Sequence, residues 1–374
     1  MNKIQVILAV IGAGEGALPI VKKAKEMNVQ TLAFGHIDSI AREFIDIFVE
    51  SDIFDINFIL SVCEKYNVSG IIASSEITTE IAAIIAARLK LPGNDVKHGF
   101  GAKNKYIMRT RIANLQSVKQ PLFTLYKEGE VYDYPVVVKA LDSCGKRGIS
   151  IAYNLKDLLE AVTNAQLYSS NGQVLIEQYL EGGREYSIEC IVGNDNYDIV
   201  QYTEKESSGP PHFIEIAHHQ PANLSEALKK KIDIAVYDIL HTLGITCGMA
   251  HLEIKIIEDE IYFIEIGARG GGDHIADMLT LLSTGFDYFK AAIDCSLGRY
   301  KHQKICNVAY SGIYFHCEQN KGLASLFNKA TTAKWCIQNT VTNNEFLEAS
   351  SNIETSKSGY FIYCADHKIT NKDS

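Results

Sequence analysis

Residues 248–269 read GMAHLEIKIIEDEIYFIEIGAR, in which two runs of alternating apolar and polar residues flank an acidic triplet at positions 258–260. Alternation with a period of two is typical of a β-strand, and two such runs around a short polar turn predict an antiparallel hairpin. If the turn centres on Asp259, Glu253 lies directly opposite Glu265, and His251 lies opposite Gly267. The hairpin therefore predicts two carboxylates on one face of a sheet.

These two glutamates have two open interpretations. Side chains directly across a ladder come within about 5 Å, where like charges repel, so the pair invites a divalent cation. Oxygen ligands favour Mg²⁺ or Mn²⁺. The alternative is a solvent-exposed sheet face on which Lys255 neutralises the acids.

A glycine-rich loop follows the hairpin directly. Arg269 is followed by Gly270, Gly271, Gly272 and Asp273, and a helix is expected from about residue 274. Glycines expose backbone N–H groups at a helix N-terminus, which favours an anion, and a guanidinium adds a positive charge. A pair of metal-binding carboxylates beside an anion site is the arrangement that phosphoryl chemistry needs.

Two further segments carry candidate nucleotide-binding residues. Lys139 ends the apolar strand Pro135–Ala140, and a buried ammonium usually reaches an opposite charge. The turn at 142–148 has glycines, a hydroxyl and two cations, so it can close over phosphates, although an exposed hairpin tip has the same composition. Residues 174–189 form a strand, a turn and a second strand, with Glu185 placed to accept from ribose hydroxyls; the alternative is an ordinary sheet-edge connection.

The first hundred residues alternate short β-branched runs with helical stretches, which predicts a parallel sheet covered on both faces. Leu91-Pro92-Gly93 then marks a domain boundary. The elements expected before it are strands Ile4–Ile11, Thr31–Phe34 and Gly70–Ala73 and helices Leu18–Met27, Phe58–Tyr66 and Thr79–Leu89.

The turn at residues 12–17 matches the dinucleotide-binding pattern G-x-G-x-x-A. That pattern also requires an acid about 20 residues further on, and Asp38 is a loose match. A lone glycine motif is a weak signal, so close packing of the helix against the strand is the favoured interpretation, with an NAD-dependent dehydrogenase as the open alternative.

The remaining chain mixes strands and helices. Residues 207–221 contain three of the seven prolines and are expected to be loop or edge. Residues 305–374 are expected to be rich in strands, with one helix near 322–330. Further strands are expected at 135–140, 149–153, 174–177 and 186–192, and further helices at 155–165, 225–243, 274–284 and 287–296.

Composition bounds the class of protein. The 374 residues suggest two or three domains, and 47% apolar with 22% charged residues excludes a disordered chain. The net charge of −9 argues against a general nucleic-acid binder. Nine cysteines without a C-x-x-C pair fit a reducing compartment. The sequence contains no uninterrupted run of 18 apolar residues, so no membrane span is expected. We therefore expect a soluble, cytoplasmic protein.

Taken in order, these segments resemble the ATP-grasp superfamily over essentially the whole chain. The resemblance implies that Lys105, Lys139 and the loop residues Ser143, Gly145, Lys146 and Gly148 hold the ATP phosphates. It implies an adenine-reading hinge at Glu177, Gln178, Tyr179 and Leu180, a ribose carboxylate at Glu185 and metal ligands at Glu253 and Glu265. Arg269 resembles the catalytic arginine that steadies an acyl phosphate, and Lys139 the catalytic lysine.

Within that superfamily, His251-x-Glu253 with Glu265-Ile-Gly-Ala-Arg269 is similar to L-amino-acid ligases, which join two amino acids. Residues 208–221 resemble their substrate loop, so His219, His251, Arg269, Gly271 and Gly272 are candidate substrate-binding residues. Many members have asparagine two residues after the second metal glutamate, where this chain has Gly267, which puts a second metal ion in doubt.

The resemblance implies an ATP-grasp fold in three parts. These are an N-terminal Rossmann-like α/β domain at 1–100, a nucleotide-binding domain at 101–300 with a lid at about 110–178, and a strand-rich segment at 301–374 that completes the large domain. It implies ATP and Mg²⁺, or Mn²⁺, as cofactors. The expected partners are a small carboxylate and a small amine, with a homodimer left open and no nucleic acid or membrane.

The implied activity is ATP-dependent ligation of a carboxylate, most simply an amino acid, to an amine through an acyl phosphate, with release of ADP and phosphate. Two other functions stay open. One is an ATP-grasp carboxylase or ligase that acts on a nucleotide or sugar amine, and the other is a non-catalytic ATP-binding module.

Overall fold

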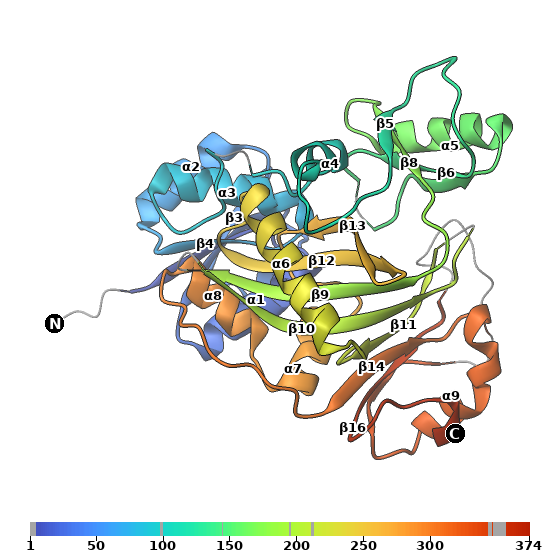
Figure 1. Cartoon of the computed structure of the whole chain (residues 1–374). Coiled ribbons are helices and arrows are strands. Elements are labelled where there is room, and N and C mark those ends of the chain that lie inside the picture. The colour runs from blue at the N-terminus through green and yellow to red at the C-terminus, as the bar shows by residue number, and fades with distance from the viewer. Residues whose placement is uncertain are drawn as a thin grey trace.

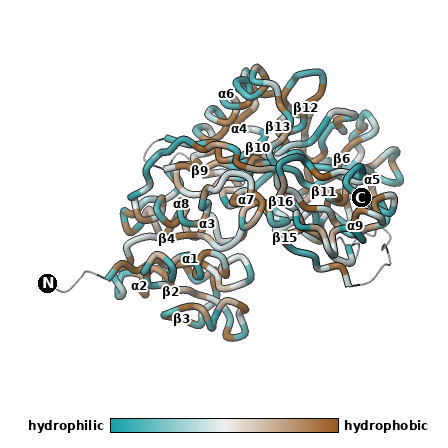
Figure 2. The backbone as a smooth tube through the Cα atoms, turned by 90° about the horizontal axis from the view of Figure 1, so that it is seen from below, coloured by the Kyte–Doolittle hydropathy of each residue, from teal (hydrophilic) through white to brown (hydrophobic). Residues whose placement is uncertain are grey.

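The computed structural model describes residues 5–97, 100–143, 145–193, 196–210, 213–342, 346 and 357–374. Its described strands form three sheets, one of four parallel strands, one of eight strands and one of four antiparallel strands. The parallel sheet and the small antiparallel sheet lie at opposite ends of the molecule, with the eight-stranded sheet between them (Figures 1 and 2). This mixed α/β architecture confirms the expected fold class.

The N-terminal sheet has the strand order β3-β2-β1-β4, all parallel. Alternate residues of its central strand pack on different helices, because side chains of a strand point to opposite faces. Leu8 and Val10 contact one core and Ile7 and Ile11 the other. The elements are β1 (Ile7–Ile11), β2 (Gln30–Gly35), β3 (Ile47–Glu50), β4 (Gly70–Ala73), α1 (Leu18–Glu26), α2 (Ile56–Tyr66) and α3 (Thr79–Leu89).

The small sheet has the order β5-β8-β6-β7 and is covered by one helix. Its elements are β5 (Phe123–Leu125), β6 (Val136–Ala140), β7 (Ile149–Ala152), α5 (Leu155–Tyr168) and β8 (Val174–Gln178). The helix α4 (Lys105–Ile112) precedes it. The turn between β6 and β7 reaches the large sheet, since Lys146 Nζ donates to Glu215 on β11 at 2.7 Å, and it also accepts from Lys105 of α4 at the Ser143 carbonyl, at 2.7 Å.

The large sheet has the order β13-β12-β9-β10-β11-β14-β16-β15. The helix α6 (Glu226–Thr242) crosses one face (Figure 1) and buries an apolar stripe that includes Ile232, Val236 and Ile239. The strands are β9 (Arg184–Gly193), β10 (Asn196–Ser207), β11 (Glu215–Gln220), β12 (Gly248–Ile257), β13 (Glu260–Gly267), β14 (Tyr310–Phe315), β15 (Cys336–Asn339) and β16 (Tyr360–Ala365).

The chain after the hairpin joins the sheets into one body. A π-helical turn at Ile275–Leu279 leads into α7 (Thr280–Thr284) and α8 (Tyr288–Ser296), and α9 (Ala324–Ala330) follows later. The helix α8 packs on the N-terminal sheet through Ala291, Ala292 and Ile293, which share a core with β1 and α1. The glycine-rich loop is therefore held between the N-terminal sheet and the large sheet.

The β12–β13 hairpin confirms both predicted pairs, Glu253 with Glu265 and His251 with Gly267. The predicted turn centre was wrong by half a residue, because the turn is the two-residue segment Glu258-Asp259, with φ of 51° and 61°. That turn alone would pair Glu265 with Leu252, on the face that packs against α6. A β-bulge at Ile264 inserts one extra residue and restores the predicted pairing.

Two segments of the large sheet differ from the sequence expectations. Residues 215–220 are not loop or edge but an interior strand, because Pro210 and Pro221 fall outside it and leave its N–H groups free to pair with β10 and β14. The strand β10 was missed altogether. A register shift between Ile199 and Gln201 interrupts its alternation, which hides the strand pattern. Among the helices that the structure describes, none combines the length and apolar character needed to cross a membrane.

Candidate functional site

The polar face of the large sheet, opposite α6, borders a cavity of about 270 Å³. Its walls come from the N-terminal unit, the start of α4, the turn between β6 and β7, the hairpin and the glycine-rich loop. Residues far apart in sequence therefore meet here. The sequence-predicted residues that line it are Lys105, Ser143, Gly145, Lys146, His251, Glu253, Glu265, Arg269 and Gly272; Cys144 of the same turn is outside the described residues.

Each of the paired glutamates has a lysine beside it. Lys105 Nζ lies 2.9 Å from Glu265 Oε1, and Lys205 Nζ donates to Glu253. Burial would lower the pKa of Lys105, but Glu265 outweighs it and raises the pKa. The two carboxylates thus lie in a cation-rich cavity. The interpretation as a solvated sheet face neutralised by Lys255 does not hold, because Lys255 instead lies near Glu185.

A buried carboxylate links the hairpin to the glycine-rich loop. Glu189 on β9 is fully buried; its Oε1 lies 2.5 Å from His251 Nδ1, and its Oε2 accepts from the Gly271 N–H at 3.1 Å. His251 Nε2 lies 3.2 Å from Glu253 Oε1. Burial opposes protonation of His251, but the two glutamates outweigh it and raise its pKa to about 9. His251 is therefore an imidazolium that bridges Glu189 and Glu253.

Sequence reasoning missed several charged residues of this cavity. Lys205 on β10 lies 3.2 Å from Glu215, which also accepts from Lys146 at 2.7 Å. Burial would raise the pKa of Glu215, but these two lysines outweigh it and hold the pKa at about 2. Lys205 escaped notice because its strand was not recognised, and the other missed lining residues are Glu76, His218, Asp273 and Lys357.

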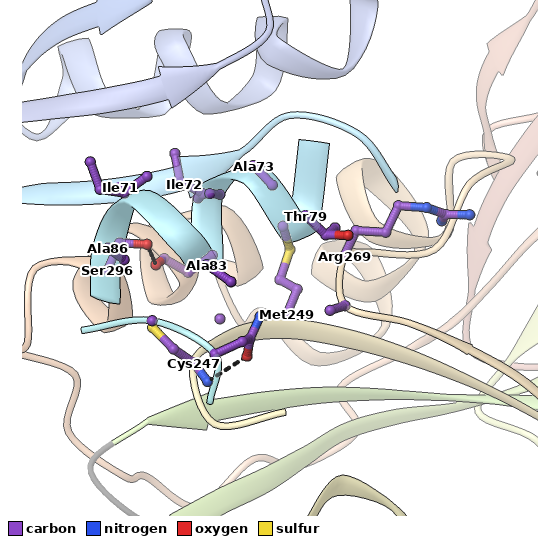
Figure 3. Close-up of a pocket in the computed structure, with 16 residues that line it drawn as sticks. Ile71, Ile72, Ala73, Thr79, Ala83, Ala86, Cys247, Met249, Arg269 and Ser296 are labelled. Atoms are coloured by element: carbon purple, nitrogen blue, oxygen red, sulfur yellow. Dashed lines mark hydrogen bonds between the residues drawn. The ribbon is translucent and has the colours of Figure 1, made fainter. Parts of the chain in front are cut away.

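Arg269 is oriented by the N-terminal unit. Its Nη2 donates to Glu76 Oε2 at 2.8 Å, and Glu76 follows β4. Behind Arg269 lies a small cavity of about 40 Å³, whose walls include Ile71, Ala83 and Met249. Figure 3 shows the Arg269 side chain extending away from these apolar residues. The guanidinium therefore belongs to the polar cavity, and the small cavity has room for water at most.

Lys139 and Glu177 do not line the cavity. Lys139 Nζ lies 2.6 Å from Glu177 Oε2, and Arg109 Nε lies 2.6 Å from Glu177 Oε1. All three side chains are buried, and the two cations overcome desolvation to hold the pKa of Glu177 at about 2. The structure places Lys139 beside a protein carboxylate of the neighbouring strand β8, where Val137 pairs with Glu177, and the expected contact of Lys139 with a phosphate stays a prediction.

The other expected nucleotide residues cluster beside Lys255. Its Nζ donates to the Leu180 carbonyl at 2.8 Å, lies 5.8 Å from the centroid of the Tyr179 ring and is 3.9 Å from Glu185 Oε1. Gln178 is exposed at the end of β8, and the buried Gly148 packs against α5 with φ of 70°. None of these residues lines the polar cavity.

His219 does not reach the cavity either. It is buried, its Nδ1 lies 2.9 Å from the Tyr363 hydroxyl, and its ring packs on Tyr314. Burial lowers its pKa despite the neighbouring carboxylate of Glu206. The neighbouring His218 points into the cavity instead, because successive residues of β11 face opposite sides. Pro211 and His212 of the predicted substrate loop lie outside the described residues.

The donor set suits a magnesium ion that also binds phosphate. Among the described residues, no group of three or more His, Cys, Asp or Glu side chains is gathered as a closed metal site. Mg²⁺ usually takes one or two carboxylates and fills its other positions with water and phosphate oxygens. Glu253 and Glu265 supply two carboxylates at a cavity with room for phosphates, so they fit this use.

A second cavity of about 870 Å³ adjoins the first. The two share Glu76, Gly145, Arg269, Gly272 and Asp273. The second also reaches Gly271, the start of α1, and Phe315 and Tyr360 on β14 and β16. Its volume is within the range of small-molecule sites, and Arg269 stands where the two spaces meet.

Comparison with known proteins identifies the family. Residues 107–305, more than half of the chain, match the family described as "Carbamoyl-phosphate synthase L chain, ATP binding domain". The carbamoyl phosphate synthase large chain of Pseudothermotoga lettingae is 28% identical over 155 residues, which cover 41% of this chain and 14% of that protein. Dapdiamide A synthase of Enterobacter agglomerans is 26% identical over 239 residues, 59% of this chain and 55% of that protein.

The chain thus spans at most about half the length of the curated relatives it matches. Its fold is similar to the crystal structure of an L-amino acid ligase from Bacillus licheniformis, with a TM-score of 0.78 and 20% identity over 98% of this chain and 95% of that one. The family match and this shared fold confirm the resemblance to the ATP-grasp superfamily. The chain belongs to the family of carbamoyl-phosphate synthase L chain ATP-binding domains, and so to the ATP-grasp superfamily.

Proposed function

We propose that this chain is an ADP-forming ligase that activates a carboxylate as an acyl phosphate and joins it to an amine. The observation that carries the proposal is one cavity in which Glu253 and Glu265 face each other, with Lys105, Lys205 and Arg269 in its walls. Phosphoryl transfer depends mainly on positioning and on neutralising charge, and this cavity supplies both.

The reaction has two steps. A carboxylate oxygen attacks the γ-phosphorus of ATP, the bond from that phosphorus to the bridging oxygen breaks, and ADP leaves. A free amine then attacks the acyl carbon; the C–N bond forms, inorganic phosphate leaves, and one proton of the amine goes to solvent. Lys105, Lys146 and Lys205 neutralise the phosphates, and Arg269 neutralises the oxygens of the acyl phosphate.

Mg²⁺, held by Glu253 and Glu265, would supply further charge neutralisation at the β- and γ-phosphates. Both carboxylates also pair with lysines of this cavity, Glu265 with Lys105 and Glu253 with Lys205.

The substrates that we propose are amino acids. The support is the similarity to Dapdiamide A synthase and to an L-amino acid ligase, together with the second cavity beside Arg269. Its volume exceeds what one small amino acid fills, so it can hold the acid and the amine together.

The test is a substrate panel with the whole chain, ATP and Mg²⁺, without bicarbonate. Single amino acids and pairs are screened for ADP and phosphate, and products are weighed by mass spectrometry. We expect amino-acid-dependent ADP formation and a product equal to two amino acids minus one water. Glu265→Gln, which keeps the size of the side chain, is the matched control and should lower both signals by about 10²- to 10³-fold.

Two outcomes would contradict the proposal. Turnover that needs bicarbonate and a nucleotide or sugar amine would assign the chain to the carboxylases. Tight ATP binding without turnover over the whole panel of acids and amines would assign it to the non-catalytic modules.

A further inference from the structure

Lys357 differs from the other lysines of the polar cavity. It comes from the C-terminal segment just before β16, and only 15% of its side chain is exposed. Lys105, Lys146 and Lys205 each have a carboxylate within hydrogen-bond distance. Among the residues placed by the structure, the nearest carboxylate recorded for Lys357 is Asp273, at 3.9 Å, which is beyond hydrogen-bond reach.

The remaining surroundings of Lys357 are apolar or already engaged. Its ammonium lies 3.4 Å from the centroid of the Phe315 ring. Asp273 also faces His218, at 3.3 Å between Oδ2 and Nε2. Burial lowers the pKa of Lys357 despite the attraction of Asp273 and Glu215. An ammonium in this setting is stabilised by any anion that enters the cavity.

The position of Lys357 indicates which anion that is. It lines the polar cavity, whereas Phe315 and Tyr360 beside it line the second, larger cavity. Asp273 lines both. Lys357 therefore lies at the junction of the two spaces, on the side formed by β14 and β16. An anion held at this junction would lie between the polar cavity and the larger cavity.

We propose that Lys357 binds the carboxylate that ATP phosphorylates and presents it, together with Arg269, at the junction of the two cavities. This inference rests on the proposed ligase function. It gives the C-terminal segment a direct part in the site, since this segment closes the substrate space and contributes the cation that fixes the acid. Carboxylate and phosphate share the chemistry that an ammonium recognises, so the test separates them.

The experiment measures steady-state kinetics of Lys357→Met and Lys357→Arg in the whole chain, with the amino acid that gives the fastest ADP formation. Methionine keeps the packing on Phe315 and removes the charge. We expect the KM for the amino acid to rise about 10- to 100-fold in Lys357→Met, the range for losing one hydrogen bond to a charged group. The KM for ATP should stay within about twofold, and arginine should restore part of the loss.

Lys368→Ala is the matched control, because Lys368 lies on the same segment but pairs with Glu204 and Glu206 outside the cavity. It should leave both KM values unchanged. A parallel rise in the KM for ATP would assign Lys357 to the phosphates, and unchanged kinetics in Lys357→Met would remove it from the site; either result overturns the inference while the ligase function stands. An unaltered chain that forms no ADP with any amino acid would instead overturn the ligase function, and this inference with it.

Discussion

Arg109→Met tests whether the site depends on a buried cation that no substrate touches. Arg109 is 2% exposed and donates to Glu177 at 2.6 Å and to the carbonyls of Phe263 and Ile264 at 2.8 and 2.9 Å. Ile264 is the extra residue of the β-bulge that turns Glu265 toward Glu253. The arginine therefore stabilises the bulge from outside the sheet. Its removal should disturb the positions of Glu253 and Glu265.

The expected cost follows from these contacts. Removing one partner of a buried ion pair costs about 3–5 kcal/mol, and each carbonyl left without a donor costs about 1–3 kcal/mol. Lys139 stays beside Glu177 and still neutralises it, which reduces the cost of breaking the ion pair. We expect a net loss of about 3–5 kcal/mol, which at about 2 °C per kcal/mol for a chain of this size lowers Tm by about 6–10 °C.

The assay is thermal unfolding followed by urea unfolding, with Glu177→Gln and the double variant alongside. Glu177→Gln leaves two cations unpaired, so Arg109→Met in that background should cost at least 1 kcal/mol less than in the unaltered chain. Arg109→Lys keeps the charge but cannot reach all three acceptors. Its Tm should therefore lie between that of the unaltered chain and that of Arg109→Met. A Tm for Arg109→Met within 2 °C of the unaltered chain would refute the reasoning.

Three other predictions follow from the same geometry. Glu265→Gln should lower amino-acid-dependent ADP formation by about 10²- to 10³-fold and raise the Mg²⁺ concentration needed for half-maximal rate; an unchanged Mg²⁺ dependence would count against the metal site. Gly271→Ala should lower both Tm and activity, because its Cβ would lie 2.7 Å from His251 Nδ1 and 3.1 Å from Glu189 Oε1. Gly272→Ala is the control and should keep the unaltered Tm, because its Cβ would meet nothing within 4 Å. The pKa of Glu177 is held at about 2, below its ordinary value of 4.5. The contribution of the ionised Glu177 to stability is therefore complete above pH 4.5 and is lost as the pH falls toward 2. Over that range Tm should drop in the unaltered chain and drop less in Glu177→Gln.

Local patterns in the sequence were enough to predict the paired glutamates. Glu253 and Glu265 are twelve positions apart in one hairpin, and alternation with a short turn determines which side chains share a face. The prediction still depended on two features that compensate each other. The turn is one residue tighter than expected, and the bulge at Ile264, held by Arg109 from α4, returns Glu265 to the expected face.

Lysines show where local patterns fail. The sequence placed Lys139 at the end of a buried strand but could not say that Glu177 from β8 would neutralise it there. It also gave no reason to single out Lys205, because a bulge interrupts the alternation of β10. Both outcomes depend on which strand lies next to which, and the order of strands in a sheet is not encoded in any single strand.

By itself, the sequence determined the class of the fold, the hairpin with its facing carboxylates, the glycine-rich loop after it and the resemblance to ATP-grasp ligases, because each of these depends on residues close together in the chain. Only the tertiary structure decided which cations surround the glutamates, that His218 and not His219 faces the cavity, and that Lys357 reaches it from the C-terminal segment. The physical reason is that a buried charge takes its partner from whichever strand packing brings beside it, at any distance along the chain.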